Sequence, residues 1–155
     1  MDLQTEGIEG TVVTFAGGSL HEAALVGLTA EVAGEWLVVT DRSPFHPVSL
    51  SWPDQPGDRG WLICGTNRSR VLDSREGLLN QRTGVLSVGD AARALKRSDP
   101  DLTSVVLHVT DAAPTTKAVT LEVDAAFRAA LSLQHTGVHL AALVLNKVAA
   151  GFWSK

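Results

Sequence analysis

The stretch AVTLEVDAAFRAALSLQHTGVHLAALVLNKVAAG, residues 118–151, changes its hydrophobic pattern at Asp124. Residues 118–123 are rich in valine, leucine and threonine, a composition that favours a strand. From Asp124 to Gly151 there is no proline, and these two residues stand where helices commonly take an N-cap and a terminating glycine. We therefore expect a strand that leads into one long helix over residues 124–151.

The predicted helix is apolar on almost every side. One side would carry Phe127, Leu131, Val138, Leu145 and Val148. Further apolar side chains, Leu140, Leu143 and Val144, point elsewhere around the helix. A helix of this kind is normally covered on several faces. We therefore expect residues 118–155 to begin a second structural layer.

Residues 1–117 have the pattern of short strands separated by turns. The expected strands are 10–15, 35–40, 60–64, 69–73 and 104–109, and residues 118–123 continue the series. A short helix over 90–97, capped by Ser87 or Asp90, interrupts them. Many short strands favour a small antiparallel sheet or barrel. The predicted fold class is α+β, with a β-barrel-like domain over 1–117 followed by the long helix of a second domain over 118–155.

A proline-rich segment separates two of these strands. Residues 41–60, DRSPFHPVSLSWPDQPGDRG, hold four of the six prolines of the chain. This density excludes a helix or a central strand and predicts a stiff, extended loop. Loops of this length inside a domain are often functional.

Composition narrows the class of protein. Apolar residues make up 45% of the chain and charged residues 19%, which is typical of a globular protein. We find no secretory signal and no apolar run of membrane-spanning length, so we expect a cytoplasmic protein without a membrane partner. The single cysteine, Cys64, fits a reducing compartment.

Charge is unevenly distributed along the chain. The net charge of −4 argues against a uniformly basic nucleic-acid-binding protein. Residues 66–97 nevertheless carry seven basic and three acidic side chains. The basic ones are Arg68, Arg70, Arg75, Arg82, Arg93, Lys96 and Arg97. Such a cluster predicts a phosphate-contacting face, with an ordinary solvated surface as the alternative.

Two histidines four residues apart lie in the predicted helix. His135 and His139 would share one helical face, and this is a common way for a helix to offer two imidazoles to zinc. The HExxH pattern of zinc proteases is absent, because no glutamate follows the first histidine. From spacing alone, the alternative is a pair of packed histidines without a metal.

Three stretches together resemble the alanyl-tRNA editing hydrolases, the stand-alone relatives of the alanyl-tRNA synthetase editing domain. They are VVTDRSPFHPVSLSWPDQPGDRG (38–60), VVLHVTDAAP (105–114) and LEVDAAFRAALSLQHTGVHLAALV (121–144). In that family a D-x-T-P-F-x-P run leads into a glycine-rich turn. A strand with an L-H-V segment follows, and then a Val-Asp opens a helix with H-T-x-x-H.

The resemblance implies a zinc-dependent hydrolase that removes a wrongly attached amino acid from tRNA. His135 and His139 would be the first two zinc ligands, on the helix that opens a two-layer α/β editing domain. Gln55 and Asp58 would border the substrate pocket, and Gln134 and Thr136 would contact the substrate or the ligands. The seven basic residues of 66–97 would contact aminoacyl-tRNA.

The chain departs from the family pattern at two places. Residues 49–52 replace the family's glycines, and no Cys-x-x-x-His pair follows His139. We therefore expect the chain to be the front part of a longer protein, or a third ligand to come from His21, His46 or His108. The alternative function is a catalytically silent homologue that binds tRNA, an aminoacyl group or a partner protein.

Overall fold

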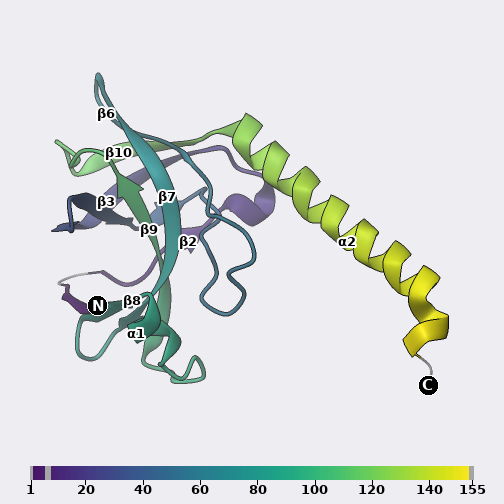
Figure 1. Cartoon of the computed structure of the whole chain (residues 1–155). Helices are drawn as coiled ribbons and strands as arrows, with labels where there is room; N and C mark the ends of the chain where they lie inside the picture. The colour runs from purple at the N-terminus through teal and green to yellow at the C-terminus, as the bar shows by residue number, and fades with distance from the viewer. Residues whose placement is uncertain (1, 6–7, 154–155) are drawn as a thin grey trace. The chain divides into compact units, whose positions relative to one another are not determined.

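A computed structural model describes residues 2–5 and 8–153 of the chain (Figure 1). The chain divides into two compact units, Met1–Asp124 and Ala125–Lys155. The first unit is built mainly of antiparallel strands and the second is a single helix, so the fold is mixed α+β.

The first unit contains short strands, two long strands and two helical turns. In chain order these elements are β1 (Asp2–Gln4), β2 (Val12–Val13), the 3-10 turn η1 (Phe15–Gly17), β3 (His21–Val32), β4 (Glu35–Thr40), β5 (Arg42–Ser43), β6 (Gly60–Cys64), β7 (Asn67–Asn80), β8 (Val85–Val88), α1 (Asp90–Arg93), β9 (Leu102–Thr110) and β10 (Ala118–Val123). The second unit is the helix α2 (Ala125–Trp153).

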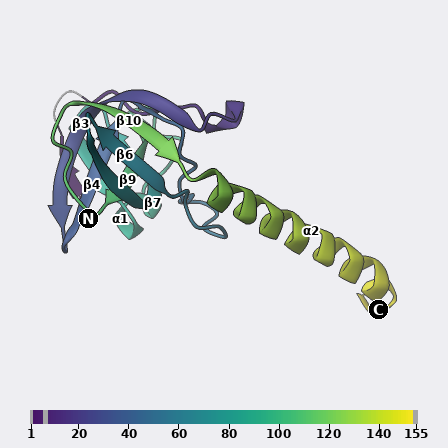
Figure 2. The same ribbon diagram turned by 90° about the horizontal axis from the view of Figure 1, so that it is seen from above.

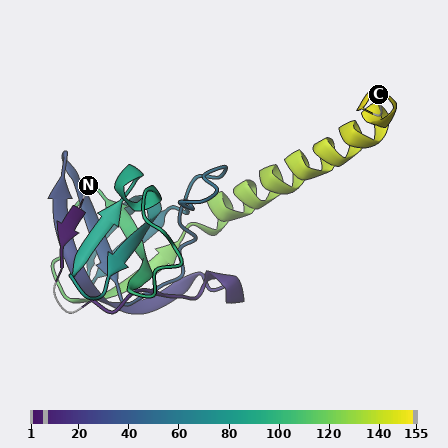
Figure 3. The same ribbon diagram turned by 90° about the horizontal axis from the view of Figure 1, so that it is seen from below.

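Six strands of the first unit form a closed antiparallel ring. The order is β7–β6–β10–β3–β4–β9, and β9 pairs again with β7 to complete it. Figures 2 and 3 show the strands of this unit from two opposite directions. Strands β8 and β1 extend the sheet beyond β7, and β2 pairs in parallel with β5. The expected small antiparallel barrel is therefore present.

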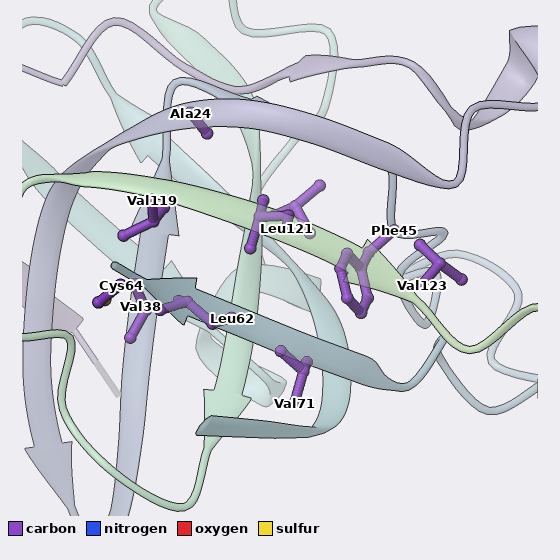
Figure 4. Close-up of a cluster of buried hydrophobic side chains, with 10 residues drawn as sticks. Ala24, Val38, Phe45, Leu62, Cys64, Val71, Val119, Leu121 and Val123 are labelled. Atoms are coloured by element: carbon purple, nitrogen blue, oxygen red, sulfur yellow. The ribbon is translucent and has the colours of Figure 1, made fainter. Parts of the chain in front are cut away.

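Side chains of all six ring strands meet in one buried cluster. Its residues are Ala24, Val38, Phe45, Leu62, Cys64, Val71, Val106, Val119, Leu121 and Val123 (Figure 4). Residues of β6 and β10 alternate between buried and more exposed positions, as expected for strands with one face on a core. A second cluster, with Val105, Leu107 and Val109, covers the opposite face of β9. β9 is consequently buried on both faces.

The strands predicted at 35–40, 60–64 and 118–123 are confirmed with the same bounds. The strand expected at 10–15 is only Val12–Val13, because η1 begins at Phe15. The predictions missed the two short strands β1 and β5 and also β3 and β8. The β3 sequence HEAALVGLTAEV is rich in alanine, leucine and glutamate, which favour helices, and pairing with β4 and β10 overrides that preference.

The predicted helix over 90–97 is shorter than expected, since α1 ends at Arg93. Its capping was also predicted wrongly. The N-cap is Gly89, with a φ of 63° and no side-chain hydrogen bond, rather than Ser87 or Asp90. Glycine takes this positive-φ backbone conformation with little steric cost, which explains the residue at this position.

Strand β10 belongs to the barrel. The prediction that residues 118–123 begin the second domain is wrong, because β10 pairs with β6 on one side and with β3 on the other. The boundary between the two units accordingly follows Asp124 rather than residue 117.

The long helix was expected at 124–151 and extends over Ala125–Trp153. Its large apolar side chains are exposed, with Leu133, Leu145 and Val148 at 75%, 65% and 73%. No helix in the described part of the chain is long and apolar enough to cross a membrane.

Candidate functional site

The two helical histidines face each other on α2. Their rings meet edge to face, with centroids 4.3 Å apart, and the two Nε2 atoms are 2.9 Å apart. Two imidazole nitrogens on a tetrahedral zinc ion, each bonded at about 2.0–2.1 Å, are about 3.3 Å apart. A small opening of the pair would therefore admit the ion. Spacing predicted this juxtaposition correctly.

The histidine pair supplies two ligands of the three or four that zinc sites in proteins use. Among the described residues, no group of three histidine, cysteine, aspartate or glutamate side chains is placed to hold a metal. Gln134 and Thr136 are exposed neighbours of His135. Successive helical residues are about 100° apart around the axis, so these two side chains leave the helix on either side of His135.

The proline-rich loop after β5 is tied back onto the barrel. Asp58 is 3% exposed, and its carboxylate accepts a hydrogen bond from the His46 N–H at 2.7 Å. The Asp58 N–H donates to the His46 carbonyl at 2.9 Å. Val48 forms a bridge with Arg75 of β7. The Asp58 carboxylate therefore already has a structural partner, whereas Gln55 is half-buried in the outer part of the loop.

Gly57 lets this loop approach β7 closely. A Cβ atom at Gly57 would collide with the Ser74 carbonyl oxygen and would lie 2.7 Å from Ser74 Oγ. The same Oγ donates to the carbonyls of His46 and Asp58 at 2.9 and 3.1 Å. A side chain at residue 57 would separate the loop from the strand.

We expect Gly57→Ala to destabilise the barrel by about 1–3 kcal/mol, the usual cost of forced overpacking. The loss should be visible in urea denaturation followed by tryptophan fluorescence. Gly17→Ala is a matched control, because nothing lies within 4 Å of a Cβ atom at residue 17. Equal stability of the two variants would contradict the close docking of the loop.

His108 is fully buried, and both of its ring nitrogens have partners. Nδ1 lies 3.0 Å from the Val38 carbonyl, and Nε2 lies 2.8 Å from Ser43 Oγ. A carbonyl only accepts, so Nδ1 carries the proton and Nε2 accepts from the Ser43 hydroxyl. Burial lowers the pKa of His108 from 6.5 to about 4, against a smaller opposing effect of the Val38 carbonyl. His108 is thus a neutral core residue, which excludes it as a third metal ligand in this fold.

The other two histidines considered as third ligands lie in the barrel unit. His21 begins β3 and is exposed. His46 is exposed at the base of the proline-rich loop, and its ring meets Phe15 edge to face with centroids 4.7 Å apart. Neither belongs to a three-residue metal-binding group in the described part of the chain.

Most of the basic residues of 66–97 are engaged in ion pairs. The pairs are Arg68–Glu122, Arg75–Asp73, Arg75–Glu35, Arg82–Asp101, Arg93–Asp90 and Arg97–Glu76. Arg68 also lies over the Trp61 ring, 4.1 Å from its centroid. Within residues 2–5 and 8–153, Arg70 and Lys96 form no ion pair. Carboxylate partners therefore offset much of the positive charge that residues 66–97 carry.

Glu76 is a site residue that the sequence did not indicate. Its side chain is 14% exposed and accepts hydrogen bonds from the Leu50 N–H, from Arg97 and from the Ser104 hydroxyl. These partners come from three separate segments, which only the folded barrel brings together. No periodicity or spacing in the sequence marks such a site.

No known protein-family model matches the chain, and a search of curated proteins finds no match.

Proposed function

We propose that this chain belongs to a zinc-dependent hydrolase that deacylates mischarged aminoacyl-tRNA, of the alanyl-tRNA editing type. The observation that carries the proposal is the pair of imidazoles on α2, whose Nε2 atoms are 2.9 Å apart. The order of elements adds support, because a β-barrel precedes the helix that bears H-T-x-x-H. On this proposal the α2 unit is part of an editing domain.

His135 and His139 would hold Zn²⁺ as two of its ligands, and water, substrate or further protein groups would complete the set. Bound zinc polarises an ester carbonyl and lowers the pKa of a coordinated water. The fold positions the two imidazoles before metal binding, since residues four apart lie on the same helical face. Gln134 and Thr136 would orient the ester beside them.

The test combines metal binding with hydrolysis. Two properties are measured on the protein and on the double variant His135→Ala plus His139→Ala. They are the zinc content, by mass spectrometry under native conditions, and the deacylation of mischarged tRNA. We expect the double variant to lose both zinc and activity. Ser132→Ala, on the same helix, is the matched control and should retain both. Full deacylation by the double variant would exclude the proposed metal site.

A second candidate is a catalytically silent homologue that binds tRNA, an aminoacyl group or a partner protein. The observation that favours it is the histidine pair without a third ligand among the described residues. Binding of tRNA together with an absence of both zinc and hydrolysis would support this candidate over the hydrolase.

If tRNA contacts the 66–97 segment, Arg70 and Lys96 should carry most of the phosphate contact. Both lack ion pairs with other residues in the described ranges, so they release the most counterions on binding. We expect Arg70→Ala plus Lys96→Ala to flatten the slope of log K against log salt by about 2. The control Arg93→Ala removes a cation paired with Asp90 and should change the slope less. An unchanged slope in the double variant would contradict contact through this segment.

A further inference from the structure

The barrel unit contains a pocket that the proposed hydrolase chemistry does not use. Its volume is about 320 Å³. This lies at the lower end of the range for small-molecule sites in proteins, roughly 300–1,000 Å³. The residues that matter for its chemistry are Val13, Phe15, His46, Glu76, Arg97 and Val106. We call it the Glu76 pocket.

The lining of the Glu76 pocket carries both signs of charge. Arg97 Nη2 lies 2.6 Å from Glu76 Oε2, which also accepts the Leu50 N–H at 2.9 Å. Glu76 Oε1 accepts the Ser104 hydroxyl at 3.2 Å. An ionised carboxylate has about four acceptor positions and a guanidinium has five N–H donors. The pair can therefore accept one more hydrogen bond at Oε1 and donate several more from Arg97.

The lining of the Glu76 pocket also includes apolar side chains. Val106 pairs with Glu76 across the two strands and is buried, whereas Val13 is 44% exposed at the pocket. Phe15 stands on η1 and meets the His46 ring edge to face. Apolar groups that line a concave surface favour an apolar ligand, because its burial removes hydrocarbon from water.

We propose that the Glu76 pocket binds a free α-amino acid with an apolar side chain. The ligand carboxylate would bind the remaining N–H donors of Arg97, and its ammonium group would donate to Glu76 Oε1. The ligand side chain would contact Val13, Phe15 and Val106. A zwitterion matches the two opposite charges held side by side, whereas a simple anion or cation would meet one like charge. The proposal does not rest on the proposed hydrolase activity.

The experiment compares three ligands that share one isobutyl side chain and differ in their charged groups. Binding of L-leucine, L-leucine methyl ester and 4-methylpentanoate to the intact protein is measured by saturation-transfer NMR and calorimetry, up to about 10 mM, well beyond the 1 mM level of weak binding. The ester lacks the carboxylate and 4-methylpentanoate lacks the ammonium group. We expect leucine to bind at least tenfold more tightly than either analogue.

Two variants locate the binding site. Arg97→Met keeps the length of an exposed side chain but removes its charge, and it should weaken leucine binding at least tenfold. Glu76→Gln should do the same, with thermal unfolding used to check that the loop remains docked. Arg93→Met, which removes another paired arginine, should bind leucine as the parent protein does. Absence of leucine binding, equal binding of either analogue, or unchanged binding by a folded Arg97→Met variant would overturn the proposal.

Discussion

Leu121→Ala is expected to destabilise the barrel by about 2–5 kcal/mol, the usual cost of truncating a buried leucine. Leu121 is fully buried on β10 and belongs to the cluster shared by all six ring strands. The loss combines the transfer free energy of the removed carbons with the cavity that they leave. Urea denaturation followed by the fluorescence of Trp36 and Trp61, which lie on β4 and β6, measures it.

Thr120→Ala is the matched control for this prediction. Thr120 neighbours Leu121 on β10, but its side chain is exposed. Its replacement should cost less than about 1 kcal/mol, the span of strand propensities. If Leu121→Ala left the barrel transition unchanged, β10 would not be part of the barrel core.

Acidification should destabilise the fold through His108. Its pKa is about 4 in the folded chain and 6.5 in its ordinary state. Between these values the unfolded chain binds a proton that the folded chain excludes, so stability is complete above pH 6.5 and falls as the pH drops towards 4. The loss over this window is roughly 3 kcal/mol at about 1.4 kcal/mol per pH unit.

The variant His108→Gln isolates this contribution from that of the carboxylates. A glutamine can keep a donor towards the Val38 carbonyl and an acceptor towards Ser43 without titrating. The free energy of unfolding of both proteins is measured by urea denaturation at pH 7.5 and pH 4. We expect the parent to lose roughly 3 kcal/mol more than the variant over this interval. Equal losses would mean that His108 takes up its proton in the fold as easily as in the unfolded chain.

The sequence predicted those elements in which the local preference of the residues and their packing in the fold favour the same secondary structure. Residues 60–64 and 118–123 are rich in side chains that favour strands and lie in strands whose residues alternate in burial, and the helix after Asp124 follows from the absence of proline. β3 was missed because its residues favour a helix in isolation. Only the neighbouring strands β4 and β10 supply the hydrogen bonds that hold it extended.

The candidate sites also differ in whether their residues are close together or far apart in the sequence. The histidine pair on α2 is local, since residues four apart on a helix are neighbours whatever else the chain does. The roles of Asp58, Glu76 and His108 depend on partners 12 to 70 residues away. The sequence holds no short-range signal for such partners. It therefore predicts Asp58 only as a residue that borders the substrate pocket, and it predicts no site at Glu76.

Closure of the six-stranded ring has a consequence for the timescale on which the backbone opens. Each ring strand is hydrogen-bonded along both edges, so none can leave without breaking two ladders at once. Amide hydrogens of β10 and β4 should therefore exchange with solvent only through global unfolding of the barrel. Those of α2, a separate compact unit, should exchange through openings of their own. Deuterium uptake would then report two independent stabilities within one chain.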